Sequence, residues 1–387
     1  MRIISIMIAS LLPFFCLAQT LKGVVIDYNT NEPIAGASVY LNGTTLGNTT
    51  DQSGHYSIKV NDIIYTQLVF SFMGYETFMI ENPFKQLPDT VYLKEKDFRV
   101  DEVTVRGRPT FSEKQKWTAF REQFLGMTPG GRSCRILNEK DIRLVYDPKT
   151  HRLHGYADVP IVLKNTYLGY NVRCELIQFT LILGPQKSLH RKNIDTAQIV
   201  ITASFEELQK INSIQSDRRK ESYKYSKNRF FKSISKSDFI NSGLVLLKDT
   251  ENASLGKLLA QEHFFNVIKK SADESTINIE VIPKNKNLDG IMSLTIAESS
   301  EPKNDNSMFS LSMGQRSSGG GIVLYTHIST LFIEADSFNV DSYGNTDLFF
   351  RLYITGDMSR YRIGDQLPLD YVPAIPSIFN IQKQASK

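Results

Sequence analysis

The chain has 387 residues, of which 41% are hydrophobic. This length exceeds the ~100 to 200 residues of a typical domain, so it predicts two or three domains with cores of their own. The 45 basic and 41 acidic residues give a net charge of only +4, and so mild a balance implies no obligate polyanion partner such as nucleic acid.

The first 18 residues have the pattern of a secretory signal peptide. Arg2 precedes an apolar run over residues 3–17, and the small residue Ala18 follows, so cleavage after Ala18 is expected. Cys16 would serve a lipid anchor, but Phe15 stands where lipidation requires a small residue. The run is shorter than the ~20 apolar residues of a membrane span, and no later segment approaches that length. We therefore expect an exported protein of the periplasm or outer membrane, without a transmembrane span in the mature chain.

Residues 20–107 show the period of two that is typical of β-strands. Apolar and polar residues alternate at 37–41 and 56–60, and further strand patterns occupy 68–72, 75–80, 90–93 and 102–105. Turn residues such as Asn42 and Gly43 separate these runs, and Asp27 and Asp51 fall at strand ends, where a carboxylate caps its own turn. Short strands with a turn about every ten residues predict a seven-stranded antiparallel β-sandwich.

The order of short motifs in this segment resembles a known family. Gly23-Val24-Val25 is followed by residues 33–39 (PIAGASV), Thr50-Asp51 and residues 70–76 (FSFMGYE). This series is similar to the carboxypeptidase-like regulatory domain, a transthyretin-like sandwich. The resemblance implies a module that accompanies other domains and whose bacterial copies also precede outer-membrane receptor barrels. It implies architecture and compartment, and no reaction.

The residues of a zinc carboxypeptidase are not in place. Such a site needs a His and a Glu at close spacing and a second, distant His. None of the six histidines is followed by Glu at that spacing, and no HExxH occurs. His151 and His154 flank an expected hairpin, where neighbouring side chains alternate between faces. The sequence therefore predicts no catalytic residues, no metal and no cofactor, and a hydrolase would need a site assembled from dispersed carboxylates.

Residues 111–387 are expected to form a larger α+β companion domain. Residues 100–105 resemble the segment that joins the regulatory module to the plug of TonB-dependent receptors. An amphipathic helix follows instead of a plug, because Ser112 and Gln115 form a capping box and Gly126 ends the helix. Strands and helices then mix, with helical periodicity at 204–212 and 254–270. Segments at 130–138, 168–170 and 367–371 are similar to an uncharacterised domain found beside the regulatory module in exported bacterial proteins.

Two groups of residues are candidates for a special role. Cys134 and Cys174 would close a disulfide in an oxidising compartment, or remain two buried thiols. Cations and aromatic residues alternate in a second group, which consists of Arg218, Arg219, Lys220, Tyr223, Lys224 and Tyr225. An anionic glycan or an acidic protein would be bound by such a patch, whereas the simpler interpretation is a solvated helical face with its aromatic residues in the core.

The sequence thus predicts a mainly β protein with an α+β C-terminal region. We expect an exported, non-enzymatic protein of the cell envelope that binds or scaffolds an envelope protein or glycan. Two alternatives stay open at this point. One is an accessory to a TonB-dependent outer-membrane receptor, and the other is a hydrolase with an unrecognised site.

Overall fold

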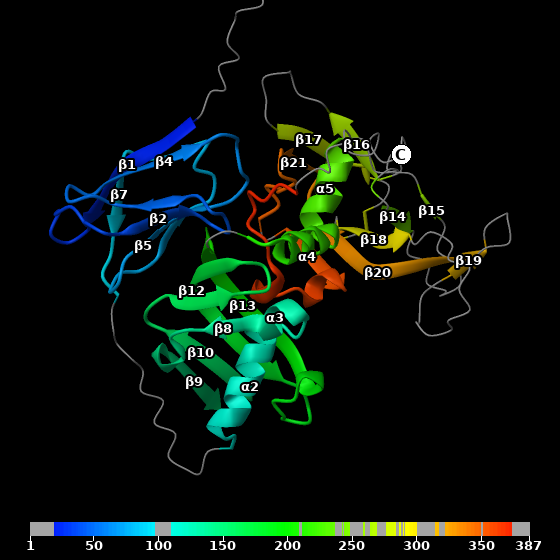
Figure 1. Ribbon diagram of the computed structural model, residues 1–387, viewed down its shortest axis with the longest axis horizontal. Coiled ribbons are helices and arrows are strands. Elements are labelled where there is room, and N and C mark those ends of the chain that lie inside the picture. The colour runs from blue at the N-terminus through cyan, green and yellow to red at the C-terminus, as the bar shows by residue number, and fades with distance from the viewer. Residues whose placement is uncertain are drawn as a thin grey trace, which may run out of the picture.

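The computed structural model (Figure 1) describes most of the chain after residue 18. The described residues are 19–96, 110–208, 211–236, 242, 244–247, 258–259, 264–268, 276–283, 286–287, 289, 291–299, 314–316, 322–349 and 351–373. The predicted signal peptide and the strand expected at 102–105 lie outside them. The protein is mainly β, as the sequence predicts.

Seven strands form the N-terminal domain. They are β1 (Gln19–Asp27), β2 (Ser38–Leu41), β3 (Gly47–Thr49), β4 (His55–Val60), β5 (Leu68–Ser71), β6 (Phe78–Ile80) and β7 (Thr90–Leu93). They make two sheets, ordered β4-β1-β7 and β3-β2-β5-β6. Alternation works as expected in β4, where Tyr56, Ile58 and Val60 are buried and the residues between them are exposed.

One strand pair departs from the predicted antiparallel arrangement. β1 and β7 run parallel, with Val24 opposite Thr90 and Asp27 opposite Leu93. Parallel neighbours need a long crossover connection. The chain between β1 and β7 provides it, since it forms β4 in the same sheet and β2, β3, β5 and β6 in the other sheet. Apolar and polar residues alternate with the same period in parallel and antiparallel strands, so the sequence pattern could not reveal the orientation of β7.

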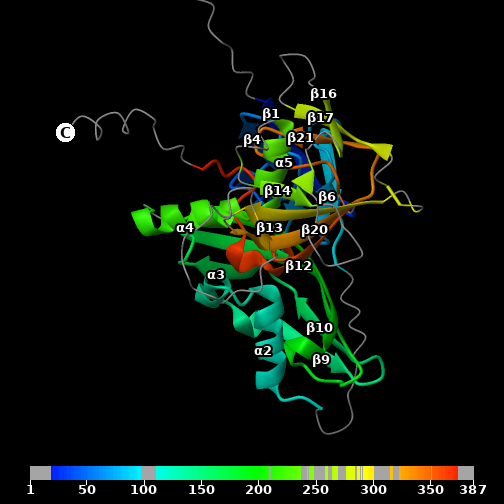
Figure 2. The ribbon, with the colours of Figure 1, turned by 90° about the vertical axis from the view of Figure 1, so that its right-hand side faces the viewer.

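The next part of the chain builds a six-stranded sheet covered by a helix. Its elements are α2 (Glu113–Phe124), α3 (Pro129–Ser133), β8 (Cys134–Ile136), η2 (Glu139–Asp141), β9 (Ile142–Asp147), β10 (Arg152–Ala157), β11 (Ile161–Asn165), β12 (Tyr170–Leu183), η3 (Arg191–Asn193) and β13 (Ile194–Glu207). The order is β8-β11-β12-β10-β9, with β13 paired to β12. Figure 2 shows α2 along this sheet. The predicted capping box of Ser112 and Gln115 is confirmed, and Phe120 packs on Phe179 at 4.6 Å between ring centroids.

The remaining elements surround another core, so the described part of residues 111–387 holds two hydrophobic cores. They are α4 (Ser213–Lys224), α5 (Lys227–Ser235), β14 (Leu244–Leu247), β15 (Leu258–Leu259), β16 (Phe265–Ile268), β17 (Thr276–Val281), β18 (Met292–Ser299), β19 (Gly314–Arg316), β20 (Ile322–Ile333), β21 (Ser337–Asp341), β22 (Leu352–Gly356), η7 (Met358–Arg360) and η8 (Ile363–Asp365). One sheet is ordered β15-β14-β18-β20-β19, with β22 on β20, and the other β16-β17-β21. Phe230, Phe231 and Ile234 of α5 are buried in this core.

Two predicted helices are wrong. Within 204–212, residues 204–207 are the end of β13, which pairs with β12. Within 254–270 the described residues include the strands β15 and β16. Apolar residues in a short run fit either periodicity, and pairing with a long neighbouring strand decides the outcome.

The N-terminal domain is bonded firmly to the rest of the chain. Gly43 donates its N–H to the Ala203 carbonyl at 2.6 Å and accepts from Leu369 N at 2.7 Å. The Tyr40 hydroxyl lies 2.7 Å from Thr202 Oγ1 and is buried. In Figure 1 the C-terminal segment, in red, lies where the N-terminal domain, β13 and α4 meet. The two domains therefore share one hydrogen-bonded interface.

Cys134 and Cys174 are free, buried thiols. This is the second of the two alternatives that the sequence left open. The two residues lie on β8 and β12, and β11 lies between these strands and pairs with both. Burial raises the pKa of the Cys134 thiol to about 12, with Asp365 contributing, and burial also raises the pKa of Cys174.

We expect the chain from residue 19 onward to expose two reactive thiols when it is denatured without reductant, and almost none when it is folded. Buried thiols with a raised pKa hold little of the thiolate that reacts. Titration with a thiol reagent in both states measures this. A denatured chain with no titratable thiol, and with a mobility that reductant changes, would restore the disulfide.

Candidate functional site

The six residues of the predicted patch lie on α4 and just after it, but they do not form one surface. Arg219 is only 3% exposed. Its Nε donates to the Leu168 carbonyl at 2.7 Å, its Nη2 to the Gly169 carbonyl at 3.1 Å, and its Nη1 to Glu207 Oε1 at 2.6 Å. The guanidinium also stacks 3.8 Å from the Tyr170 ring centroid. Arg219 is thus removed from the predicted patch, since it ties α4 to β12 and β13.

The other cations of the patch remain near the surface. Arg218 is half-buried and lies 4.2 Å from the centroid of the Tyr167 ring. Lys220 is exposed and pairs with Asp217 at 3.0 Å. Lys224 lies 5.2 Å from the Tyr225 ring centroid. These cations already have partners in their own helix or its neighbours, so the stretch is a solvated helical face on this side.

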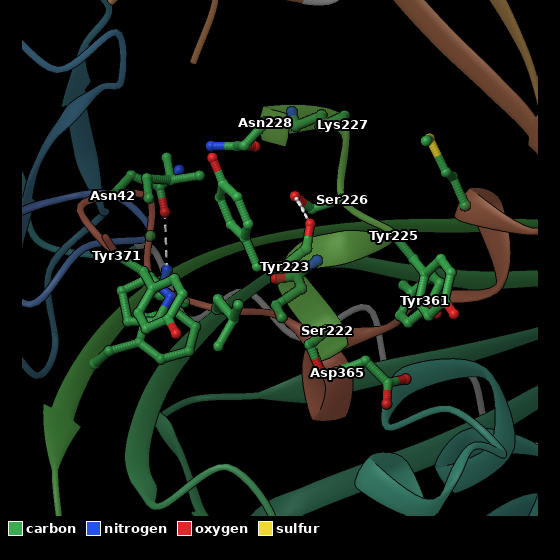
Figure 3. A pocket seen from close by; sticks show the side chains of 18 of the residues that line it. Asn42, Ser222, Tyr223, Tyr225, Ser226, Lys227, Asn228, Tyr361, Asp365 and Tyr371 are labelled. Atoms are coloured by element: carbon green, nitrogen blue, oxygen red, sulfur yellow. Dashed lines mark hydrogen bonds between the residues drawn. The ribbon is translucent and has the colours of Figure 1, made fainter. Parts of the chain in front are cut away.

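Tyr223 and Tyr225 point the other way, into a cavity of about 350 Å³. Four tyrosines line it, namely Tyr223, Tyr225, Tyr361 and Tyr371. Figure 3 shows Tyr371 and Tyr223 on one side and Tyr225 beside Tyr361 on the other. The walls come from the loop after β2, from β13, from the α4–α5 turn and from residues 354–371. Pockets of this size and apolar lining are typical of small-molecule sites.

The rings of the cavity are held in fixed positions. Tyr223 and Tyr371 lie 5.9 Å apart between centroids at an interplanar angle of 58°. Burial raises the pKa of Tyr223 to about 12 and also raises those of Tyr361 and Tyr371. These three hydroxyls therefore stay protonated at neutral pH and can donate hydrogen bonds.

Two amide side chains add polar groups to the walls. Asn42 Oδ1 accepts from Ala203 N at 2.9 Å, and Asn228 Nδ2 donates to Asn345 Oδ1 at 2.5 Å. Asn42 Nδ2 also donates to Gln67 Oε1 at 3.2 Å, so both amides help to hold the wall together. The cavity therefore combines ring faces with a few fixed polar groups, which is the composition of a site that orients a ligand.

Asp365 also lines the cavity and was missed by the sequence argument. It is 7% exposed, the Thr128 hydroxyl donates to its Oδ1, and its Oδ2 has no hydrogen-bond partner among the described residues. Burial raises the pKa of this carboxyl. Three segments that the sequence singled out contact residues of the cavity or of α4, namely residues 130–138, 168–170 and 367–371. Gly130 packs on Asp365, Gly169 binds Arg219, and Tyr371 faces Tyr223.

Within the described ranges, no group of three or more His, Cys, Asp or Glu side chains could hold a metal ion. Over the same ranges, no helix has the length and apolar character needed to cross a membrane.

Comparison with known proteins identifies the first domain. Residues 21–105 are a CarboxypepD_reg-like domain. The resemblance seen in the sequence is therefore confirmed. The chain is also similar to the TonB-dependent receptor SusC of Bacteroides thetaiotaomicron, with 40% identity over 94 residues. That match covers 23% of this chain and 8% of SusC.

The carboxylates of the CarboxypepD_reg-like domain have structural roles. Asp27 accepts from the Tyr75 hydroxyl at 2.5 Å and from the N–H groups of Asn29 and Thr30, and these bonds lower its pKa. Asp51 accepts from Ser53 N and His55 N at 2.9 Å each. Both residues close turns, as the sequence predicts. This domain reaches the cavity through Asn42 and Gly43.

Proposed function

We propose that the protein is an exported, non-enzymatic component of the cell envelope and that it binds a glycan in the tyrosine-lined cavity. The observation that carries this proposal is the position of four tyrosine rings and two amide side chains around one cavity of about 350 Å³. Ring faces pack on the apolar faces of a sugar, and hydroxyl and amide groups bond its hydroxyls. The similarity of the first domain to SusC supports an envelope setting.

Glycan binding is tested by removing the rings. Tyr223→Ala and Tyr371→Ala are each expected to weaken binding by about tenfold, or about 1.4 kcal/mol, because a ring that packs on the ligand is lost. Binding is measured on an oligosaccharide array and then by calorimetry with the best ligand. Tyr156→Ala is the matched control, since Tyr156 is 46% exposed on β10 and does not line the cavity. If no oligosaccharide binds the unmodified chain, or if Tyr156→Ala weakens binding equally, the proposal is wrong.

A second candidate is an accessory to a TonB-dependent receptor. The 40% identity over 94 residues to SusC, a TonB-dependent receptor, supports this candidate. Crosslinking in intact envelopes, followed by capture of the chain, should then recover an outer-membrane receptor in fixed proportion. Capture without any such receptor would leave glycan binding as the better proposal.

A further inference from the structure

A second hollow of about 350 Å³ adjoins the tyrosine-lined cavity. Five residues line both spaces, namely Asn42, Ile201, Lys227, Ile354 and Leu369. They come from the loop after β2, from β13, α5 and β22, and from the C-terminal segment. The two spaces therefore meet at one junction, and a ligand in the cavity reaches the second hollow there.

The second hollow has largely apolar walls, and we call it the apolar hollow. Apolar side chains line it without lining the cavity, and they are Met79, Val200, Leu348, Phe349 and Leu352. Leu348 is buried, whereas Met79, Phe349 and Leu352 are half-buried and Val200 is 38% exposed. Apolar surface from β6, β13 and residues 348–352 is thus left open to water at one place. Covering it with an apolar ligand is favourable.

Polar side chains of the apolar hollow are occupied within the protein. The Thr66 hydroxyl donates to the Asn42 carbonyl at 2.6 Å. Asn345 Nδ2 donates to the Leu369 carbonyl at 3.1 Å, and Asn345 Oδ1 accepts from Asn228 Nδ2 at 2.5 Å. A ligand in this hollow therefore finds few free partners for hydrogen bonds, whereas apolar contacts are available.

The tyrosine-lined cavity offers the opposite chemistry. Among the described residues, none forms a hydrogen bond with the hydroxyls of Tyr223, Tyr361 and Tyr371. These hydroxyls are free to bond the hydroxyls of a sugar. Lys227, at the junction, is exposed, and a lysine there can extend its ammonium into water. A polar space and an apolar space therefore adjoin, and each suits a different part of one ligand.

We propose that the ligand is a glycolipid, whose sugar lies among the tyrosines and whose aliphatic chain lies in the apolar hollow. Such a molecule matches the change in wall chemistry across the junction. A purely polar oligosaccharide that crossed the junction would give up hydrogen bonds to water in the apolar hollow without gaining partners. This inference rests on the proposed glycan binding and adds the apolar part of the ligand.

The test uses methyl, hexyl and octyl β-glucoside as probes of the full chain, at concentrations at which each is monomeric. Affinities are measured by ligand-observed NMR. Each methylene that the apolar hollow buries should tighten binding about fourfold. Octyl glucoside should therefore bind more than about tenfold more tightly than hexyl glucoside, and methyl glucoside should bind most weakly.

Two variants place polar groups in the apolar hollow. Val200→Asp and Met79→Gln should each weaken octyl glucoside by about tenfold or more and leave methyl glucoside unchanged. Ile177→Asp is the matched control, because Ile177 is 43% exposed on the neighbouring strand β12 and lines neither space. It should bind all three probes as the unmodified chain does. Tyr223→Ala should weaken all three probes, since they share the sugar.

The inference is overturned if no glucoside binds, or if octyl glucoside binds no more tightly than methyl glucoside. It is also overturned if both hollow variants keep the gain from the alkyl chain, or if Ile177→Asp removes that gain equally. Octyl glucoside binding that Tyr223→Ala leaves unchanged would show a chain bound without its sugar, which rejects a glycolipid as well. Oligosaccharide binding on the array that depends on Tyr223, without any gain from an alkyl chain, would keep the proposed function and reject only the aliphatic part.

Discussion

Arg219→Met is expected to lower the free energy of unfolding by about 3 kcal/mol. Methionine fills much of the same volume, but it removes the donors at 2.7 and 3.1 Å from the carbonyls of Leu168 and Gly169. The Gly169 carbonyl keeps the Leu208 N–H at 3.0 Å, so the Leu168 carbonyl is the acceptor that loses its partner. A buried acceptor that loses its partner costs about 1 to 3 kcal/mol. The ion pair with Glu207 adds less, because the Glu207 side chain is 53% exposed and water screens the pair.

Lys220→Met provides the comparison, since Lys220 is the next residue of the same helix and its ion pair with Asp217 is exposed. It should change stability by less than about 0.5 kcal/mol. Chemical denaturation of both variants measures the difference. Equal stabilities of Arg219→Met and the unmodified chain would show that the guanidinium is dispensable to the fold.

The same contacts decide how a combined variant of the patch would behave. Replacing Arg218, Arg219 and Lys220 together by Ser removes the buried guanidinium of Arg219 along with two charges near the surface. Because Arg219 is buried, the triple variant should melt at a lower temperature. Any loss of binding would then report unfolding as well as lost charge.

The N-terminal domain could be predicted well from sequence because its signals are local. Alternation in residues 56–60 fixes which side chains face the core, and Asp51 with Gly54 fixes the turn before β4. The orientation of β7 was not predictable in this way, since strand pairing is a long-range property.

The site could be predicted only in part. The sequence identified Tyr223 and Tyr225 as members of a surface patch; Tyr223 lies on α4, and Tyr225 is the capping residue after it. Which face of α4 is buried depends on Leu168, Gly169 and Tyr170, about 50 residues earlier in the chain. Asp365 and Tyr371 complete the cavity from the other end of the chain, and no spacing rule connects residues so far apart.

Gly43→Ala is expected to destabilise the protein by about 3 kcal/mol, and Gly74→Ala by only about 1 to 2 kcal/mol. Both glycines have positive φ, +75° at Gly43 and +88° at Gly74, so an alanine strains the backbone at either position. At Gly74 the added Cβ has open space, whereas at Gly43 it comes within 3.2 Å of Leu369 Cγ and Cδ1. The difference between the two variants therefore measures the interface between domains.

Amide hydrogen exchange shows which part of the structure the Gly43→Ala substitution disturbs. The Leu369 N–H donates to the Gly43 carbonyl at 2.7 Å, and the Gly43 N–H donates to Ala203 at 2.6 Å. In Gly43→Ala the Leu369 amide should exchange faster than in Gly74→Ala, because the alanine pushes residues 366–371 away from the loop after β2. Equal exchange at Leu369 in both variants would mean that the first domain can move without disturbing the cavity. Faster exchange of the Leu369 amide in Gly43→Ala alone would show that the CarboxypepD_reg-like domain holds part of the proposed ligand site in position.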